Sequence, residues 1–223
     1  MIIFVTGGSA SGKSGYAGKL AERLSLDHPD DKSILYIATL SDRSEESEQR
    51  VKRHRQLRKT GSYRVKECFS LETLRNLSAN DNTENSLVFP QEQEGLRHGI
   101  VIFDSLDGFT ANVFFGETDS FLKRKTDRLA EKTAGLMKSL AAVSTVLIIV
   151  SDAVYSDGIQ YDEGTRGYME YTAMTEQLLV AAADQVVEVV CGIPLLLKGE
   201  RDEYLQVARD NDVSLYENPD ARN

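Results

Sequence analysis

The clearest chemical signal in the sequence is a glycine-rich run that follows a short apolar segment near residue 1. It satisfies the pattern G-x-x-x-x-G-K-[ST] and consists of Gly7, Gly8, Ser9, Ala10, Ser11, Gly12, Lys13 and Ser14. Glycines let a backbone curl until its N–H groups point at phosphate oxygens, and the positive end of a following helix adds to the attraction. In such a loop the lysine reaches the β- and γ-phosphates and the serine hydroxyl binds Mg²⁺. The run therefore predicts a nucleoside triphosphate site, with a glycine-rich turn that binds nothing as the alternative.

A second signal is the acidic residue Asp104, which ends the apolar run 100–103. In proteins with a phosphate loop, an acid at the end of a buried strand holds Mg²⁺ directly or through water. A simple strand-end residue is the alternative, but the phosphate loop upstream favours the metal or nucleotide role. Asp107 is either a second acid of this site or an N-cap, and its place before a short stretch favours the N-cap.

The third signal is a basic segment. Between Arg50 and Lys66 the chain carries eight basic residues and no acidic one, although the whole sequence has a formal charge of −9. Arg50, His54 and Arg58 are four positions apart, so on a helix they share one face. Cations around a histidine disfavour its protonated form and leave a neutral ring that can act as a nucleophile. The flanking guanidinium groups are suited to neutralise phosphate charge. A solvated helix face is the alternative.

The elements that must position these residues are short β-branched apolar runs that alternate with longer amphipathic runs. This alternation is typical of a mostly parallel sheet covered by helices, and thus of an α/β fold. Strands are expected at residues 2–6, 34–39, 63–67, 100–104, 145–151, 185–191 and 193–197. Helices are expected at residues 13–26, 45–59, 71–77, 119–143 and 165–183. Only Gly192 separates the last two strands, so they are expected to form an antiparallel hairpin at the sheet edge.

Composition narrows the class of protein. The chain has 223 residues, of which 41% are hydrophobic and 27% charged, as in ordinary globular domains. We expect one domain over residues 1–198, with a polar insertion at 78–99 and a polar extension at 199–223. The net charge argues against a protein that coats nucleic acid, and no apolar run approaches the ~20 residues of a membrane span. Two cysteines without metal-ligand spacing give no disulfide framework, so the expected location is the cytoplasm.

With these residues in hand, the chain resembles the bifunctional adenosylcobinamide kinase / adenosylcobinamide-phosphate guanylyltransferase family of cobalamin biosynthesis. The phosphate loop matches the family's Gly-Gly-x-Arg-Ser-Gly-Lys-Ser run except at Ala10, and residues 35–39 match its second strand. Residues 50–58 match the signature R-[IV]-x-x-H-[RK]-x-x-R, which is the most specific part of the resemblance. Further matches are Glu67, Asp104, Asn112, residues 181–184 and residues 192–194.

The resemblance implies a fold, a chemistry and a set of site residues. The fold would be a P-loop NTPase of the RecA-like kind, a three-layer sandwich with a mostly parallel sheet and an antiparallel edge hairpin. GTP or ATP would phosphorylate adenosylcobinamide, and GMP would then pass from GTP to adenosylcobinamide phosphate through a guanylyl intermediate on His54. Lys13 and His54 would be catalytic, with Mg²⁺ held by Ser14 and Asp104 in a homotrimer. The nucleotide-binding residues implied beyond the loop are Ala38, Thr39, Leu40, Arg55, Arg58, Glu67 and Asp104.

The C-terminal half departs from the family pattern. Ser151-Asp152-Ala153 stands where the family has Ser/Thr-Asn-Glu, and Glu176 stands where asparagine is usual. One alternative is therefore a divergent relative that binds GTP but performs one step or uses another acceptor. A non-catalytic nucleotide-binding regulatory protein is a second alternative, although it leaves the lysine, histidine and acid without a catalytic reason. A generic small-molecule P-loop kinase is a third, and it leaves the basic segment around His54 unexplained.

Overall fold

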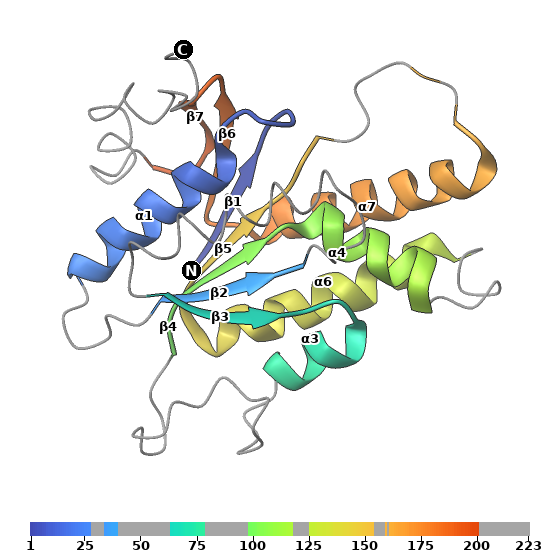
Figure 1. Cartoon of the computed structure of the whole chain (residues 1–223), viewed down its shortest axis with the longest axis horizontal. Helices are drawn as coiled ribbons and strands as arrows, with labels where there is room; N and C mark the ends of the chain where they lie inside the picture. The colour runs from blue at the N-terminus through green and yellow to red at the C-terminus, as the bar shows by residue number, and fades with distance from the viewer. Residues whose placement is uncertain are drawn as a thin grey trace, which may run out of the picture.

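The structure is a computed structural model, and it describes residues 1–27, 34–39, 63–78, 98–117, 125–153, 159 and 161–200. The strands among these residues form one seven-stranded sheet in the order β3-β2-β4-β5-β1-β6-β7 (Figure 1). They are β1 Ile2–Thr6, β2 Ile34–Ala38, β3 Tyr63–Glu67, β4 His98–Asp104, β5 Ser144–Val150, β6 Gln185–Val190 and β7 Ile193–Lys198. Neighbouring strands are parallel except β6 and β7, which are antiparallel. The predicted mostly parallel sheet with an antiparallel edge pair is confirmed.

Helices cover both faces of the sheet and make it the middle of three layers (Figure 1). The helices are α1 Lys13–Asp27, α3 Leu71–Ser78, α4 Leu106–Asn112, α6 Thr126–Ala142 and α7 Glu163–Ala182, with a π-helical turn η1 at Val113–Glu117. Helix α1 packs on one face through a buried stripe that includes Leu20 and Leu24. Helices α3, α4, α6 and α7 share the core on the other face. The predicted three-layer sandwich is therefore confirmed.

Strand β1 illustrates why the strands read as unbroken apolar runs. Ile3 and Val5 belong to the core beneath α1, whereas Ile2 and Phe4 belong to the core on the opposite face. Successive side chains of a strand point to opposite faces, so a strand covered on both sides needs an apolar residue at every position. The same requirement explains β5, whose residues Val146 to Val150 are all buried.

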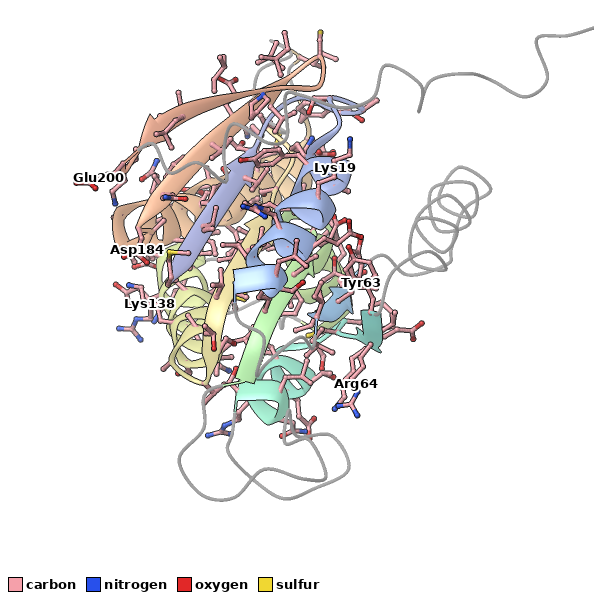
Figure 2. The ribbon with its side chains drawn as sticks, turned by 90° about the vertical axis from the view of Figure 1, so that its left-hand side faces the viewer. Lys19, Tyr63, Arg64, Lys138, Asp184 and Glu200 are labelled. Atoms are coloured by element: carbon pink, nitrogen blue, oxygen red, sulfur yellow. The ribbon has the colours of Figure 1, made fainter. Side chains whose placement is uncertain are left out.

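The edge hairpin is held at both ends. Cys191 and Gly192 join β6 to β7 with φ values of 50° and 80°, and two positive φ angles in a two-residue loop are typical of a type I′ hairpin. At the other end of β6, Asp184 lies beside the start of β1 (Figure 2), and its Oδ2 accepts a hydrogen bond of 2.7 Å from the Ile2 amide. The hairpin is thus fixed to the strand that leads into the phosphate loop.

Several element boundaries differ from the predicted ones. The predicted set has no equivalent of α4 or η1, and the helix expected at 119–143 is described from Thr126. Of the polar insertion expected at 78–99, Ser78 is the last residue of α3 and His98 the first residue of β4, and residues 79–97 lie outside the described residues. The helix expected at 45–59 and most of the extension, residues 201–223, lie outside the described residues. Among the helices described, none has the length and apolar character to cross a membrane.

Candidate active site at the carboxyl ends of the strands

The strand register gathers the predicted site residues along one edge of the sheet. Glu67, Ala38, Asp104 and Val150 are consecutive partners across β3, β2, β4 and β5, and Val150 in turn pairs with Val5 of β1. The chain leaves each of these parallel strands at the same edge, where ligands of α/β sheets bind. Because β5 lies between β1 and β4, the residues that follow β5 sit between the phosphate loop and Asp104.

The phosphate loop has the backbone that its glycines permit. Gly7 has φ of 147°, and a Cβ there would lie 2.4 Å from the Val189 carbonyl oxygen, so only glycine fits. Gly12 has φ of 96°, and Ala10 adopts φ of 58°, a region that non-glycine residues rarely occupy. The Ala153 amide donates to the Gly7 carbonyl at 3.1 Å. This bond ties the loop to the segment that follows β5.

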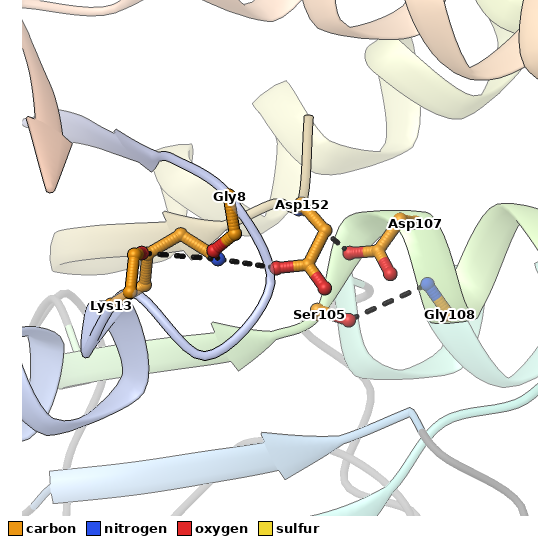
Figure 3. Close-up of polar contacts among 7 residues, drawn as sticks. Gly8, Lys13, Ser105, Asp107, Gly108 and Asp152 are labelled. Carbon is orange, nitrogen blue, oxygen red and sulfur yellow. Dashed lines mark hydrogen bonds and ion pairs between the residues drawn. The ribbon is translucent and has the colours of Figure 1, made fainter. Parts of the chain in front are cut away.

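Lys13 points back into the phosphate loop rather than into solvent. Its side chain is only 5% exposed, and its ammonium forms an ion pair with Asp152 Oδ1. The same Nζ donates to the Gly8 carbonyl at 2.5 Å (Figure 3) and lies 3.4 Å from Ser11 Oγ. A phosphate entering the loop would therefore meet a positive charge that two oxygens already position. The Lys13–Asp152 pair is the central polar contact of the site.

Asp152 also connects Lys13 to a second acid on α4. The Asp152 amide donates to Asp107 Oδ1 at 3.0 Å (Figure 3). Burial raises the pKa of Asp107 to about 6, and the negative charge of Asp152 adds to the rise, while hydrogen bonds from Asp152 and Ser105 oppose it. The favoured reading of Asp107 as an N-cap is wrong, because Ser105 caps α4 by accepting from the Gly108 amide at 3.4 Å. The Asp107 carboxylate instead contacts Asp152, which pairs with the phosphate-loop lysine, so Asp107 is a second acid beside that pair.

A third carboxyl group, Glu176 of α7, joins this cluster. Burial raises the pKa of Glu176 to about 7, the charges of Asp107 and Asp152 add to the rise, and the nearby Ser151 hydroxyl opposes it. Glu176 Oε1 and Ser151 Oγ are both buried side-chain oxygens. Three carboxyl groups, those of Asp107, Asp152 and Glu176, thus lie close enough to affect one another's ionisation. The crowding makes ionisation of Glu176 costly.

Replacing Glu176 by glutamine is expected to stabilise the protein at alkaline pH. The folded protein binds the Glu176 proton more tightly than the unfolded chain does, so this group lowers stability as pH rises from about 4.5 through 7. Removing the charge should raise the free energy of unfolding by about 1–3 kcal/mol at pH 8 and by less than about 1 kcal/mol at pH 5, where the unfolded chain has only begun to lose this proton. Urea unfolding at the two pH values measures the difference.

The matched control for this experiment is Glu170→Gln, which changes an exposed glutamate on the same helix. It should alter the free energy of unfolding by less than about 0.5 kcal/mol at both pH values, as surface substitutions usually do. An equal gain for Glu176→Gln at pH 5 and pH 8 would show that packing, and not ionisation, causes the effect.

Asp104 and its neighbours form a rigid corner beside this cluster. Asp104 is 5% exposed, and its Oδ2 accepts a hydrogen bond from the Tyr36 hydroxyl. The buried Thr39 hydroxyl donates to the Ser105 carbonyl and accepts from the Ser105 amide, both at 2.7 Å. Asn112 Nδ2 donates to the Thr39 carbonyl at 2.6 Å. These contacts lock the end of β2 to the start of α4 and hold the Asp104 carboxylate at the sheet edge.

The residues of the candidate site, those predicted from the sequence and those found in the structure, fall into three groups. The phosphate loop, Ala38, Thr39, Glu67 and Asp104 lie at the carboxyl edge of the sheet, with Glu67 exposed at the end of β3. Their ligand-binding roles stay predictions. His54, Arg55, Arg58 and Leu40 lie outside the described residues. The third group consists of residues that sequence reasoning did not assign to the site, and its members are Asp152 and Glu176.

The sequence does carry a signal for Asp152. It follows a strand that is apolar at nearly every position, as Asp104 does, and it stands at a position where the chain departs from the family pattern. Glu176 is also such a departure. Asp152 lies two residues beyond the end of β5, and Glu176 stands where an amide is usual, so these two features of the sequence could have indicated both residues.

The strand order and the lysine-bearing phosphate loop define a P-loop nucleotide-binding protein. Its strand β5 lies between β1, which leads into the phosphate loop, and β4, which ends in Asp104. The chain belongs to the cobinamide kinase / cobinamide phosphate guanyltransferase family, whose model matches residues 3–197. This confirms the resemblance drawn from the residues and makes the protein a nucleotide-binding transferase of cobalamin biosynthesis at the level of the family.

Two solved structures are similar in outline. One is the flagellar accessory protein FlaH from Methanocaldococcus jannaschii, with 14% identity, a TM-score of 0.47, and coverage of 89% of this chain and 78% of that chain. The other is a KaiC-like protein, PH0186, from Pyrococcus horikoshii OT3, with 12% identity, a TM-score of 0.39, and coverage of 84% and 69%. These likenesses add no weight to the assignment. Among curated proteins, none matches the chain.

Proposed function

We propose that this protein phosphorylates adenosylcobinamide with GTP or ATP and then transfers GMP from GTP to adenosylcobinamide phosphate. The observation that carries the proposal is the buried Lys13 in a phosphate loop, in a chain whose residues 3–197 match the family. Family membership supports nucleotide and cobinamide substrates. The order of the two steps and the covalent intermediate belong to the proposal.

The first step is phosphoryl transfer at the phosphate loop. The triphosphate displaces the Asp152 carboxylate from Lys13, because its charge is larger and the loop amides bind it as well. The hydroxyl oxygen of the acceptor attacks the γ-phosphorus, and the bond to the oxygen that bridges the β- and γ-phosphates breaks. Nucleoside diphosphate leaves, and the hydroxyl proton passes to a carboxylate of the site. Lys13 stabilises the charge that develops on the phosphate oxygens.

Mg²⁺ is the cofactor that we propose for both steps. Ser14 and Asp104 supply a hydroxyl and a carboxylate oxygen, which are the ligand types that Mg²⁺ prefers. The ion commonly takes one or two protein ligands and completes its shell with phosphates and water. Among the described residues no three His, Cys, Asp or Glu side chains are arranged to hold a metal, which fits binding together with the nucleotide. When bound, Mg²⁺ neutralises phosphate charge.

The second step is nucleotidyl transfer through His54. The imidazole nitrogen attacks the α-phosphorus of GTP, the bond to the bridging oxygen breaks, and pyrophosphate leaves. A phosphate oxygen of adenosylcobinamide phosphate then attacks the same phosphorus and breaks the P–N bond, which restores His54. Splitting the transfer gives two displacements with a good leaving group each time. Arg55 and Arg58 would neutralise triphosphate charge, and Ala38, Thr39, Leu40 and Glu67 would contact the nucleotide.

The decisive experiment uses GTP labelled at the α-phosphate. The full-length protein is incubated with this GTP and Mg²⁺ and then denatured, and the label on the chain is tested for stability in acid and base. A phosphoramidate on histidine is labile in acid and stable in base. Such label supports the proposal, and its absence overturns the guanylyltransferase step. Label without turnover of cobinamide would favour a relative that uses another acceptor.

The assembly and the location are proposed on the family resemblance alone. We propose a homotrimer that works in the cytoplasm on soluble substrates. Light scattering on the purified protein tests the assembly, because a mass close to three chains would support the trimer and a monomer mass would contradict it.

A further inference from the structure

An aromatic pair lies beside the acids of the candidate site, and the proposed nucleotide chemistry does not use it. Phe115 of the turn η1 is 56% exposed, and its ring centroid lies 5.6 Å from that of Tyr168 on α7, with the planes 43° apart. The neighbouring Phe114 is buried and stacks on Tyr171 at a centroid distance of 6.1 Å. A Cβ at Gly167 would lie 2.9 Å from the Phe114 ring, so glycine there lets the turn seat against α7. Phe114 anchors the turn, and Phe115 remains at the surface.

The aromatic pair is connected to Lys13 by an unbroken series of contacts. The Tyr168 hydroxyl donates to the Asp107 carbonyl at 3.2 Å. Asp107 Oδ1 accepts from the Asp152 amide at 3.0 Å, and the Asp152 carboxylate pairs with Lys13. The aromatic surface and the phosphate loop therefore flank the same two acids. The Tyr168 contact therefore places the aromatic pair against the backbone of Asp107.

Three features of this corner match a large acceptor that carries a hydroxyl. An exposed ring beside a second ring binds a broad apolar face, and such contacts favour rigid ring systems. A carboxylate near the phosphate loop can accept a proton from an attacking hydroxyl. Tyr168 belongs to the ring surface, and its hydroxyl bond to the Asp107 carbonyl connects that surface to the acid. A corrinoid offers this combination, because it is a macrocycle with a side arm that ends in a hydroxyl.

We propose that the acceptor binds at the corner formed by α4, η1 and the start of α7, with its ring system on Phe115 and Tyr168 and its hydroxyl directed at Asp107. The inference rests on the proposed phosphorylation of cobinamide. In the reaction the hydroxyl oxygen bonds to the γ-phosphorus, the bond to the departing nucleoside diphosphate breaks, and the proton passes to an Asp107 carboxylate oxygen.

The electrostatics of Asp107 suit this role. Burial, with the negative charge of Asp152 added, raises the pKa of Asp107 to about 6. At pH 7.5 the group is therefore mostly ionised and accepts a proton more readily than an ordinary aspartate does. The charged and titratable groups around Asp107 come from three elements. Asp152 follows β5 and carries the ion pair with Lys13, and Glu176 and Tyr168 belong to α7. Asp107 is the acid that these contacts place nearest the aromatic pair.

Phe115→Ala tests the aromatic part of the site. It should raise KM for cobinamide about tenfold, the usual size of one lost stacking contact, and leave KM for ATP within twofold. Leu197→Ala is the matched control, because Leu197 is an equally exposed apolar residue, 60% exposed, on the distant edge strand β7. It should leave both KM values unchanged. An unchanged KM for cobinamide in Phe115→Ala would overturn the proposed acceptor site.

Asp107→Asn tests the proton acceptor. Asparagine keeps an oxygen that can accept from the Asp152 amide, so the fold should survive, and circular dichroism checks this. We expect kcat for cobinamide phosphorylation to fall about 10²- to 10⁴-fold, the usual contribution of a general base, with the Kd of ATP within threefold. A kcat within threefold of wild type would contradict the role of Asp107.

Different results would contradict the proposed function and the proposed acceptor site. If the wild-type protein binds ATP but neither binds nor phosphorylates cobinamide, the proposed function is wrong and the acceptor site fails with it. If the wild type phosphorylates cobinamide and both variants behave like the wild type, the function stands and the acceptor site is wrong. Equilibrium dialysis with cobinamide and separate assays of ATP binding distinguish these results.

Discussion

Replacing Lys13 by alanine is expected to lower kcat/KM for the nucleoside triphosphate about 10²- to 10³-fold, the usual loss for one well-positioned electrostatic donor. The ammonium lies within the phosphate loop, where the Gly8 carbonyl and Asp152 hold it. The Lys13 ammonium is therefore already in position when the nucleotide binds, and its side chain loses little further conformational freedom. Initial rates of cobinamide phosphorylation at varied ATP concentration measure the loss.

The Lys13 variant needs a control for stability. Lys13→Ala leaves the Asp152 carboxylate, which is 15% exposed, without its ion-pair partner, and breaking a buried pair costs about 3–5 kcal/mol. The double variant Lys13→Ala/Asp152→Asn removes both charges and should fold better than Lys13→Ala while remaining as inactive. Lys138→Ala, an exposed lysine on α6, should retain wild-type rates. Wild-type activity in the double variant would contradict the role of Lys13.

The parts of the fold that the sequence predicts are those whose burial is dictated by local pattern. The strands and the long helices are recognisable because a layer of helices on each face imposes apolar residues along β1, β4 and β5. The phosphate loop is recognisable because its backbone needs glycine where φ is positive or where another chain segment approaches closely. In both cases the residue types over a short stretch of sequence are enough to explain why the element forms.

Helix α4 is a different case, because contacts distant in sequence stabilise it. Its seven residues include Gly108, Thr110 and Asn112, which have low helix propensity. The helix forms because Leu106 and Phe109 are fully buried and because Asn112 hydrogen-bonds to the Thr39 carbonyl. Tertiary packing overrides propensity here, and a local pattern therefore does not reveal the helix.

The acidic cluster depends on strand order in the same way. Lys13 and Asp152 meet because β5 lies between β1 and β4, and that order is a property of the whole sheet. Seen in sequence alone, Asp152 and Ala153 replace an Asn-Glu pair and suggest that a carboxylate is lost. The structure shows that a carboxylate remains at this edge, one position earlier, where it pairs with the phosphate-loop lysine. The chain therefore keeps one carboxylate at this edge of the sheet, although its position in the sequence has shifted by one residue.

Replacing His54 by alanine is expected to abolish the acid-labile label from α-labelled GTP, because no nitrogen nucleophile then remains at that position to form the P–N bond. Phosphorylation of cobinamide should stay within about twofold of wild type, because the first step uses the phosphate loop and the acids beside it. The two activities would thus separate, with Lys13→Ala reducing phosphorylation and His54→Ala eliminating only guanylyl transfer.

His28→Ala serves as the control for this experiment, because His28 lies in a polar segment to which the sequence assigns no chemistry. It should keep full labelling, which would show that loss of one histidine does not by itself reduce the label. Labelling that persists in His54→Ala would contradict the covalent intermediate. Loss of label together with loss of phosphorylation would contradict the separation of the two steps and would assign both to one site.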